Sequence, residues 1–249
     1  MWERIETEGR PELRDPILIV SLSTSLPQYK AMYSQAKELG EFLLRKIEFT
    51  KLATIYASAL PPVAVISNEG IVRLSSAEFY SHPGPPDLVL LVGDSSPQDE
   101  QYEFADAVLR YAKDLGVDEV ISIGTRWAEQ VAPPTAVPKV TGFASDDAGV
   151  KVLRGLGVEV VEDEPAPFFA SLVVGLAEKF GMTGYKLSVD HGEPVPHPLS
   201  VIRLLGVLEK MVGLHVGTDE LEAKARDMAK EIQSDGSPET GRERGGVYG

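Results

Sequence analysis

The stretch from residue 87 to residue 127 constrains the fold most, because two short apolar runs flank a helical pattern. Leu88–Gly93 and Val120–Gly124 are apolar runs rich in β-branched residues, as expected for strands buried on both faces. Between them, apolar residues recur at helical spacing from 105 to 115, and Gly116 is placed to end that helix. Strand, helix and strand joined by short turns predict a βαβ unit, and therefore a parallel sheet with a right-handed crossover.

The residues around this unit predict where its helix begins and where a ligand would lie. Ser96 suits an N-cap, Pro97 suits the first helical position, and Asp99 is an acid three residues after the cap. We therefore expect the helix to start at this point. Gly124 to Trp127 are expected just beyond the carboxyl end of the second strand, where open α/β sheets place their sites.

The rest of the chain alternates short apolar runs with helical patterns. Further strands are expected at 16–22, 53–57, 63–66, 71–74, 139–144, 158–161 and 185–189, with a hairpin between 63–66 and 71–74. Further helices are expected around the apolar stripe Met32, Ala36, Leu39 and Leu43, after Asp146–Asp147, and over 168–180, 199–212 and 218–232. The predicted fold class is α/β, with a mainly parallel sheet, helices on both faces and a C-terminal helical segment.

Composition divides the chain into four regions. Residues 1–15 are polar and charged and are interpreted as a lead-in segment. Residues 16–192 form the α/β domain, and residues 193–233 form a helical segment packed on that domain or in an oligomer. Residues 234–249 are rich in Gly, Ser, Pro and charge, a composition typical of a flexible tail.

Charge and cysteine content exclude several classes of protein. The net charge is -14 over 249 residues, so the basic face that duplex nucleic acid or an anionic membrane needs is not expected. The chain has no cysteine, which excludes disulfides and thiolate zinc sites. The sequence shows neither a signal-peptide core nor a run long enough to cross a membrane. We therefore expect a soluble, cytoplasmic protein.

Enzymatic motifs are not visible. His191 and His197 lie six residues apart in a proline-rich segment, a spacing at which neither a helix nor a hairpin would bring both side chains to one metal ion. His82 and His215 stand alone. Asp146–Asp147 has the chemistry of a general base or metal ligand, but a helix cap explains the pair. No P-loop, nucleophile elbow or dinucleotide fingerprint is present. The sequence therefore predicts no catalytic residue, metal or cofactor.

One set of residues is a candidate for a small ligand or anion. Ser23 and Thr24 follow the first buried strand, while Gly124 and Arg126 follow a central one. Both places are where α/β sheets hold ligands. The alternatives are an ordinary turn after the first strand, and stacking of Arg126 and Trp127 on the neighbouring surface.

Several segments, taken in order, carry a family resemblance. They are Glu78–Tyr80, Asp87–Asp94, Ser96–Pro97, Tyr102–Ala105, Ile121–Gly124, Lys139–Ala144, Leu156–Val160 and Pro198–Leu214. In their order and spacing, from Pro16 to Ile232, the chain resembles the PAC2 family, the proteasome assembly chaperone 2 family, and in particular its archaeal members. The resemblance implies an α/β fold similar to that of purine nucleoside phosphorylases, a likeness of fold that implies no activity.

The sequence departs from the family pattern at two turns. Ser23–Pro27 stands where the family usually has glycines after the first strand. Pro165–Pro167 stands where it usually has a Gly-rich turn before the helix that begins near Phe168. If either turn binds a small ligand in relatives, the same role is therefore not expected of that turn in this chain.

The resemblance directs attention to the C-terminal residues Val247, Tyr248 and Gly249. A hydrophobic residue, a tyrosine and a final residue of any type form the motif by which proteasome activators and similar archaeal chaperones dock between α subunits of the 20S proteasome. Val247 suits an apolar crevice, Tyr248 offers a ring and a hydroxyl, and the Gly249 carboxylate suits a lysine. One such tail binds weakly, so the mechanism implies a homo-oligomer that presents several tails.

These observations predict an archaeal proteasome assembly chaperone or 20S proteasome-binding adaptor rather than an enzyme. The alternative is a hydrolase or phosphorylase acting on a nucleoside-like small molecule, which rests on fold analogy. A structural scaffold without a proteasome link is the third class. For the tail itself, the alternative is a frayed chain end.

Overall fold

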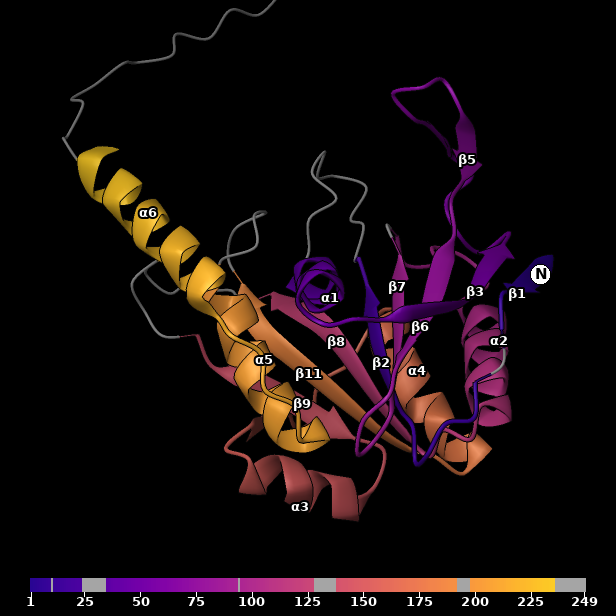
Figure 1. Ribbon diagram of the computed structural model, residues 1–249. Helices are drawn as coiled ribbons and strands as arrows, with labels where there is room; N and C mark the ends of the chain where they lie inside the picture. Colours follow the sequence, from indigo (N-terminus) through magenta and orange to yellow (C-terminus); the bar gives the residue numbers. More distant parts are fainter. Residues whose placement is uncertain (10, 24–34, 94, 128–137, 192–197, 236–249) are drawn as a thin grey trace, which may run out of the picture.

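The computed structural model describes residues 1–9, 11–23, 35–93, 95–127, 138–191 and 198–235. In this part of the chain, the strands form one nine-stranded sheet and one two-stranded hairpin (Figure 1). The large sheet contains, in spatial order, β1 (Glu3–Thr7), β3 (Thr50–Ala57), β6 (Ala77–His82), β7 (Leu88–Gly93), β2 (Ile17–Leu22), β8 (Glu119–Trp127), β11 (Thr183–His191), β9 (Val140–Ala144) and β10 (Glu159–Val160). The α-helices are α1 (Gln35–Lys46), α2 (Gln101–Asp114), α3 (Asp147–Gly155), α4 (Phe169–Ala177), α5 (Pro198–Val212) and α6 (Asp219–Asp235).

The centre of the sheet is parallel. β7, β2, β8 and β11 are neighbours and run in the same direction. β7, α2 and β8 form the predicted βαβ unit, and β2 lies between its two strands. The flanks are antiparallel, with β1, β3 and β6 on one side and β9 against β11 on the other. The α/β fold with helices on both faces is confirmed.

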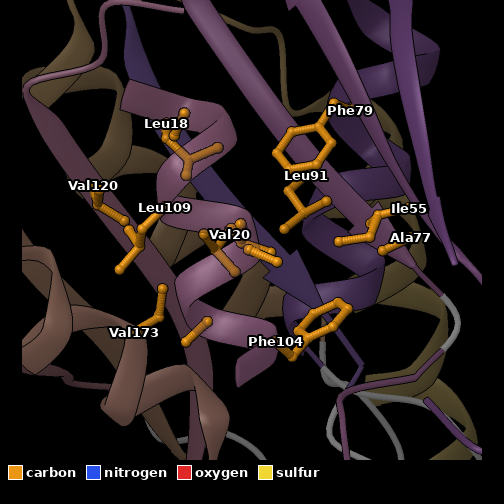
Figure 2. Packing of buried hydrophobic residues seen from close by; sticks show 14 of the residues in the cluster. Leu18, Val20, Ile55, Ala77, Phe79, Leu91, Phe104, Leu109, Val120 and Val173 are labelled. Atoms are coloured by element: carbon orange, nitrogen blue, oxygen red, sulfur yellow. The ribbon is translucent and has the colours of Figure 1, made fainter. Parts of the chain in front are cut away.

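Helices cover both faces of the sheet (Figure 1). On one face, α2 and α4 pack on residues such as Leu18 and Val20, and the ring centroids of Phe104 and Phe169 lie 5.4 Å apart. On the other face, α1 and α5 pack on Ile19 and its neighbours. Figure 2 shows how side chains of strands and helices meet in the first of these clusters. Successive residues of a strand therefore divide between two cores, as strand geometry requires.

The two C-terminal helices lie over the α1 face. α5 contacts α1, β9 and β11, and α6 packs on α5 through the buried Leu221. Glu220 of α6 forms ion pairs with Arg45 at 3.5 Å and Lys46 at 3.0 Å, both on α1. The later part of α6 extends away from the sheet (Figure 1). Among the described helices, none has the length and apolar character needed to cross a membrane.

Several predicted helix ends are confirmed. The Asp146 carboxylate accepts a hydrogen bond from the Gly149 amide at 2.7 Å and caps α3. A short 3₁₀ turn, Glu178–Phe180, follows α4 and ends at Gly181, whose φ is 70°. α5 ends before Gly213, whose φ is 66°. Glycine is suited to both positions because a positive φ strains other residues.

Other predictions were wrong in their limits. α2 begins at Gln101 rather than Ser96, because the amides of Ser96 and Gln98 bond to the carbonyls of Ser23 and Ala59 instead. The segment interpreted as a lead-in contains the edge strand β1, whose charged residues suit an exposed sheet edge. β6, in which every second residue is buried, was not predicted as a strand. Met32, predicted to lie on the first helix, is outside the described residues.

The predicted hairpin is confirmed as a separate two-stranded ribbon, β4 (Ala64–Ile66) and β5 (Val72–Leu74). It projects from the body of the molecule (Figure 1). The register pairs Ala64 with Leu74 and Ile66 with Val72, so these four side chains share one face. That face is exposed, since Ile66 retains 70% of its accessible surface and Leu74 61%.

Candidate functional site

The residues predicted to bind a partner or ligand fall in different places. Val247–Gly249 and Thr24 lie outside the described residues. Ser23 is buried directly after β2, where its amide donates to the Gly93 carbonyl at 3.4 Å and its carbonyl accepts from the Ser96 amide at 2.7 Å. The described contacts of Ser23 therefore join the end of β2 to β7 and to the segment that leads into α2.

Gly124 and Arg126 lie within β8, not after it. β8 continues to Trp127 and pairs with β11 along its whole length, from Glu119↔Thr183 to Trp127↔His191. The expected strand end at Gly124 was therefore wrong, because pairing with β11 extends the strand. The Arg126 side chain is outside the described part. Gly124 faces α4, whereas Ser23 continues the alternation of β2 onto the α1 face.

A buried lysine occupies the space beside Gly124. Lys186 of β11 lies opposite Ser122 in the register, and Ser188 lies opposite Gly124. A Cβ built on Gly124 would lie 2.0 Å from Lys186 Nζ and 3.6 Å from the Cβ of Ala170 in α4. The absence of a side chain at position 124 therefore makes room for the Lys186 ammonium beneath the first turn of α4.

Lys186 is buried without an opposing charge in the described structure. Lys186 is only 4% exposed. Its Nζ donates to Ser188 Oγ at 3.1 Å and to the Leu187 carbonyl at 3.5 Å. No described carboxylate forms an ion pair with it. Burial therefore lowers the pKa of the Lys186 amine from 10.5 to about 7.

One hydroxyl contacts this amine, and two more belong to residues on the neighbouring strands. Ser122 Oγ is fully buried and has no hydrogen-bond partner among the described residues. Thr141 Oγ1 of β9 donates to the Ser188 carbonyl at 3.5 Å. We call Ser122, Gly124, Thr141, Lys186 and Ser188 the Lys186 cluster. It combines one amine with three hydroxyls, and no carboxylate belongs to it.

The first turn of α4 lies over the Lys186 cluster and carries no acid. Its N-cap residue, Phe168, forms no side-chain cap, and it has φ 76° and ψ 157°. The positive end of the helix dipole therefore lies near a buried amine, and no described side chain compensates for it.

The sequence contained one signal for this cluster that the prediction did not use. Tyr185–Val189 alternates apolar and polar residues, which indicates a strand with a polar face. Such a face is usually solvated, but α4 covers it in the fold. Lys186, Ser188 and Ser122 were therefore missed as site residues. The described residues contain no group of three His, Cys, Asp or Glu side chains suited to a metal ion.

Solved structures with the same fold include two from Pyrococcus furiosus. The chain is similar to Pyrococcus furiosus PbaB, an archaeal proteasome activator, with a TM-score of 0.81 and 20% identity, over 94% of this chain and 99% of that one. It is also similar to P. furiosus PbaA, an archaeal homolog of proteasome-assembly chaperone, with a TM-score of 0.71 and 19% identity, over 94% and 96% of the two chains.

Sequence comparison leads to the same group of proteins. An uncharacterized protein of Methanocaldococcus jannaschii, MJ1210, is 20% identical over 197 residues, which cover 78% of this chain and 75% of the relative. The model of the PAC2 family matches residues 36–234, a range that includes all but one residue each of α1 and α6, the other described helices, and most of the large sheet. The chain therefore belongs to the PAC2 family.

Proposed function

We propose that this protein is a proteasome assembly chaperone or a 20S proteasome-binding adaptor, and that it acts without catalysing a reaction. The observation that supports this most is the likeness in fold to PbaB over 99% of that chain. PbaA, a homolog of a proteasome-assembly chaperone, shares the fold as well. Neither structure is described as an enzyme, in agreement with the non-enzymatic role expected from the sequence.

The proposed contact is the C-terminal tail, Val247–Gly249, docked between α subunits of the 20S proteasome. Val247 would enter an apolar crevice, the Tyr248 hydroxyl would form one directed hydrogen bond, and the Gly249 carboxylate would pair with a lysine. Fourteen residues follow Asp235, the last described residue of α6. A fully extended segment of this length spans at most about 50 Å, so the tail can reach a partner well beyond the folded domain.

The proposal includes a homo-oligomer. Ordering one short tail costs conformational entropy, and therefore a single tail binds weakly. Several tails presented by one assembly raise the effective concentration of each after the first has bound. We expect light scattering with size-exclusion chromatography to give a mass of more than one chain.

The test is binding of the purified full chain to archaeal 20S particles and to free α subunits. Deletion of residues 247–249 and Tyr248→Ala are expected to abolish binding, while Tyr248→Phe keeps the ring and is expected to weaken it. Tyr102→Ala is the control, because Tyr102 is a 66% exposed aromatic residue on α2 rather than in the tail. Equal binding by the deletion variant would refute the tail as the contact, and no binding by any form would refute the proteasome role.

A further inference from the structure

The Lys186 cluster has polar groups whose hydrogen-bonding capacity its described neighbours do not fill. Lys186 Nζ has three donor hydrogens when protonated, and two acceptors are shown for it, the Ser188 hydroxyl at 3.1 Å and the Leu187 carbonyl at 3.5 Å. Ser122 lies opposite Lys186 in the register, on the same face of the sheet, and its fully buried hydroxyl has no partner in the part of the chain that the structure describes. Buried polar groups without partners are rare in folded proteins and require an explanation.

A third element, the start of α4, lies beside the same place. Ala170 lies in the first turn of α4, and its Cβ and Lys186 Nζ both lie within 3.6 Å of the point where a Gly124 side chain would begin. In the first turn of α4, the Ser171 amide donates to the Phe168 carbonyl at 3.0 Å, whereas no described acceptor is shown for the amides of Phe169 and Ala170, and Phe168 supplies no side-chain acceptor. Ammonium, hydroxyl and helix N-terminus therefore come together from β11, β8 and α4.

We propose that the Lys186 cluster and the first turn of α4 bind a small oxyanion, that is, a phosphate or carboxylate group. An oxyanion has several acceptor oxygens, so it can accept from Lys186, Ser122 and the α4 amides at once. It also supplies the negative charge that the described neighbours of Lys186 lack. A cation is not suited to this site, because an amine and the positive end of a helix dipole would both oppose it.

The site is covered in the described state, and its cover is the start of α4. The segment before α4, residues 162–168, is exposed along its whole length, and Phe168 itself is 48% exposed. The anion therefore enters by displacing the first turn of α4 rather than by crossing the sheet. Gly124 acts as a positioning residue, because any side chain there would push Lys186 Nζ out of the site.

Calorimetric titration of the full chain with inorganic phosphate at neutral pH, in chloride at constant ionic strength, tests this site. We expect saturable binding by the native chain. Lys186→Met and Gly124→Ala are expected to weaken it at least about tenfold, since each removes a charge-assisted hydrogen bond from the site. Ser122→Ala is expected to weaken it severalfold while leaving the fold intact. Lys179→Met, at an exposed lysine that follows α4, removes the same charge and is expected to bind as the native chain does.

A parallel titration with acetate identifies the chemical class. Saturation by phosphate alone supports a phosphate group, and saturation by acetate alone supports a carboxylate. Thermal unfolding with and without the anion gives a second readout, because a ligand that binds only the folded chain raises the melting temperature. Lack of saturable binding of either anion to the native chain would overturn the proposal. It would also be overturned if Lys186→Met and Ser122→Ala bound phosphate as tightly as the native chain does.

Discussion

Replacing Lys186 by methionine is expected to stabilise the protein at neutral pH when no oxyanion is present. Met has a similar length and no charge, so it fills the same space beneath α4 without the need for a counter-ion. The native amine is fully buried, and burial lowers its pKa from 10.5 to about 7. In the unfolded chain the amine is solvated and has its ordinary pKa, so folding must either bury the charge or release the proton.

The magnitude follows from this difference in pKa. Between 10.5 and about 7, at roughly 1.4 kcal/mol per pH unit, the penalty amounts to about 5 kcal/mol when the amine is protonated. The unfolded chain binds more protons than the folded chain between these two values. The contribution of Lys186 to stability therefore rises with pH across this window and is lowest below about pH 7. Loss of the hydrogen bond to Ser188 offsets about 1 kcal/mol, which leaves a net gain of about 4 kcal/mol for the variant at pH 7.

Urea unfolding of both chains between pH 6.5 and 9.5, in a phosphate-free chloride buffer, measures this effect. We expect the gain from Lys186→Met to be largest near pH 7 and to shrink by roughly 1.4 kcal/mol per pH unit above it. Lys179→Met, at a side chain that is 70% exposed, should run parallel to the native chain. A constant difference across the pH range, or a variant less stable than the native chain at pH 7, would refute the assignment of an unpaired buried amine.

Two further substitutions test the residues at which α4 and α3 begin. Phe168→Gly should raise the free energy of unfolding by about 1 kcal/mol, because the backbone of residue 168, with φ 76° and ψ 157°, suits glycine alone. Phe168→Ala is the control because alanine keeps a Cβ. An equal gain from Phe168→Ala would contradict the backbone explanation. Asp146→Ala should lower the free energy of unfolding by about 1 kcal/mol through loss of the bond to the Gly149 amide. Urea unfolding measures this loss, and Asp147→Ala is the control for Asp146→Ala. An equal loss of unfolding free energy in the two variants would exclude a specific cap by Asp146.

The sequence predicted the centre of the fold better than its edges. Leu88–Gly93 and Ile17–Leu22 are apolar on both faces because helices cover both sides of the parallel centre, and such runs are easy to identify. β1 and β6 were missed because antiparallel flanking strands keep polar residues on one face. The start of α2 was placed too early because the amides of residues 96 and 98 bond to distant carbonyls, and no local pattern records that.

The Lys186 cluster was missed for a different reason. A lysine within an alternating strand usually points to solvent, and only the packing of α4 over β8 and β11 shows that this one is buried. Gly124 was singled out for its place near a strand end, yet its role depends on a lysine from another strand, 62 positions away in the chain. The candidate residues were found on single strands, whereas the site is made by neighbouring strands and a helix.

An oxyanion beside Lys186 should also change the number of protons that the protein binds. In the free protein at pH 8, a pKa of about 7 leaves roughly nine-tenths of the amine neutral. A bound anion favours the ammonium form and raises this pKa, so binding at pH 8 should take up close to one proton per site, and binding at pH 6 almost none. Sulfate is the suitable probe because it does not titrate in this range, and calorimetry in buffers of different ionisation enthalpy gives the proton count. Sulfate binding with no proton uptake at pH 8 would mean that the anion lies elsewhere, because an anion in contact with a neutral buried amine must draw a proton to it.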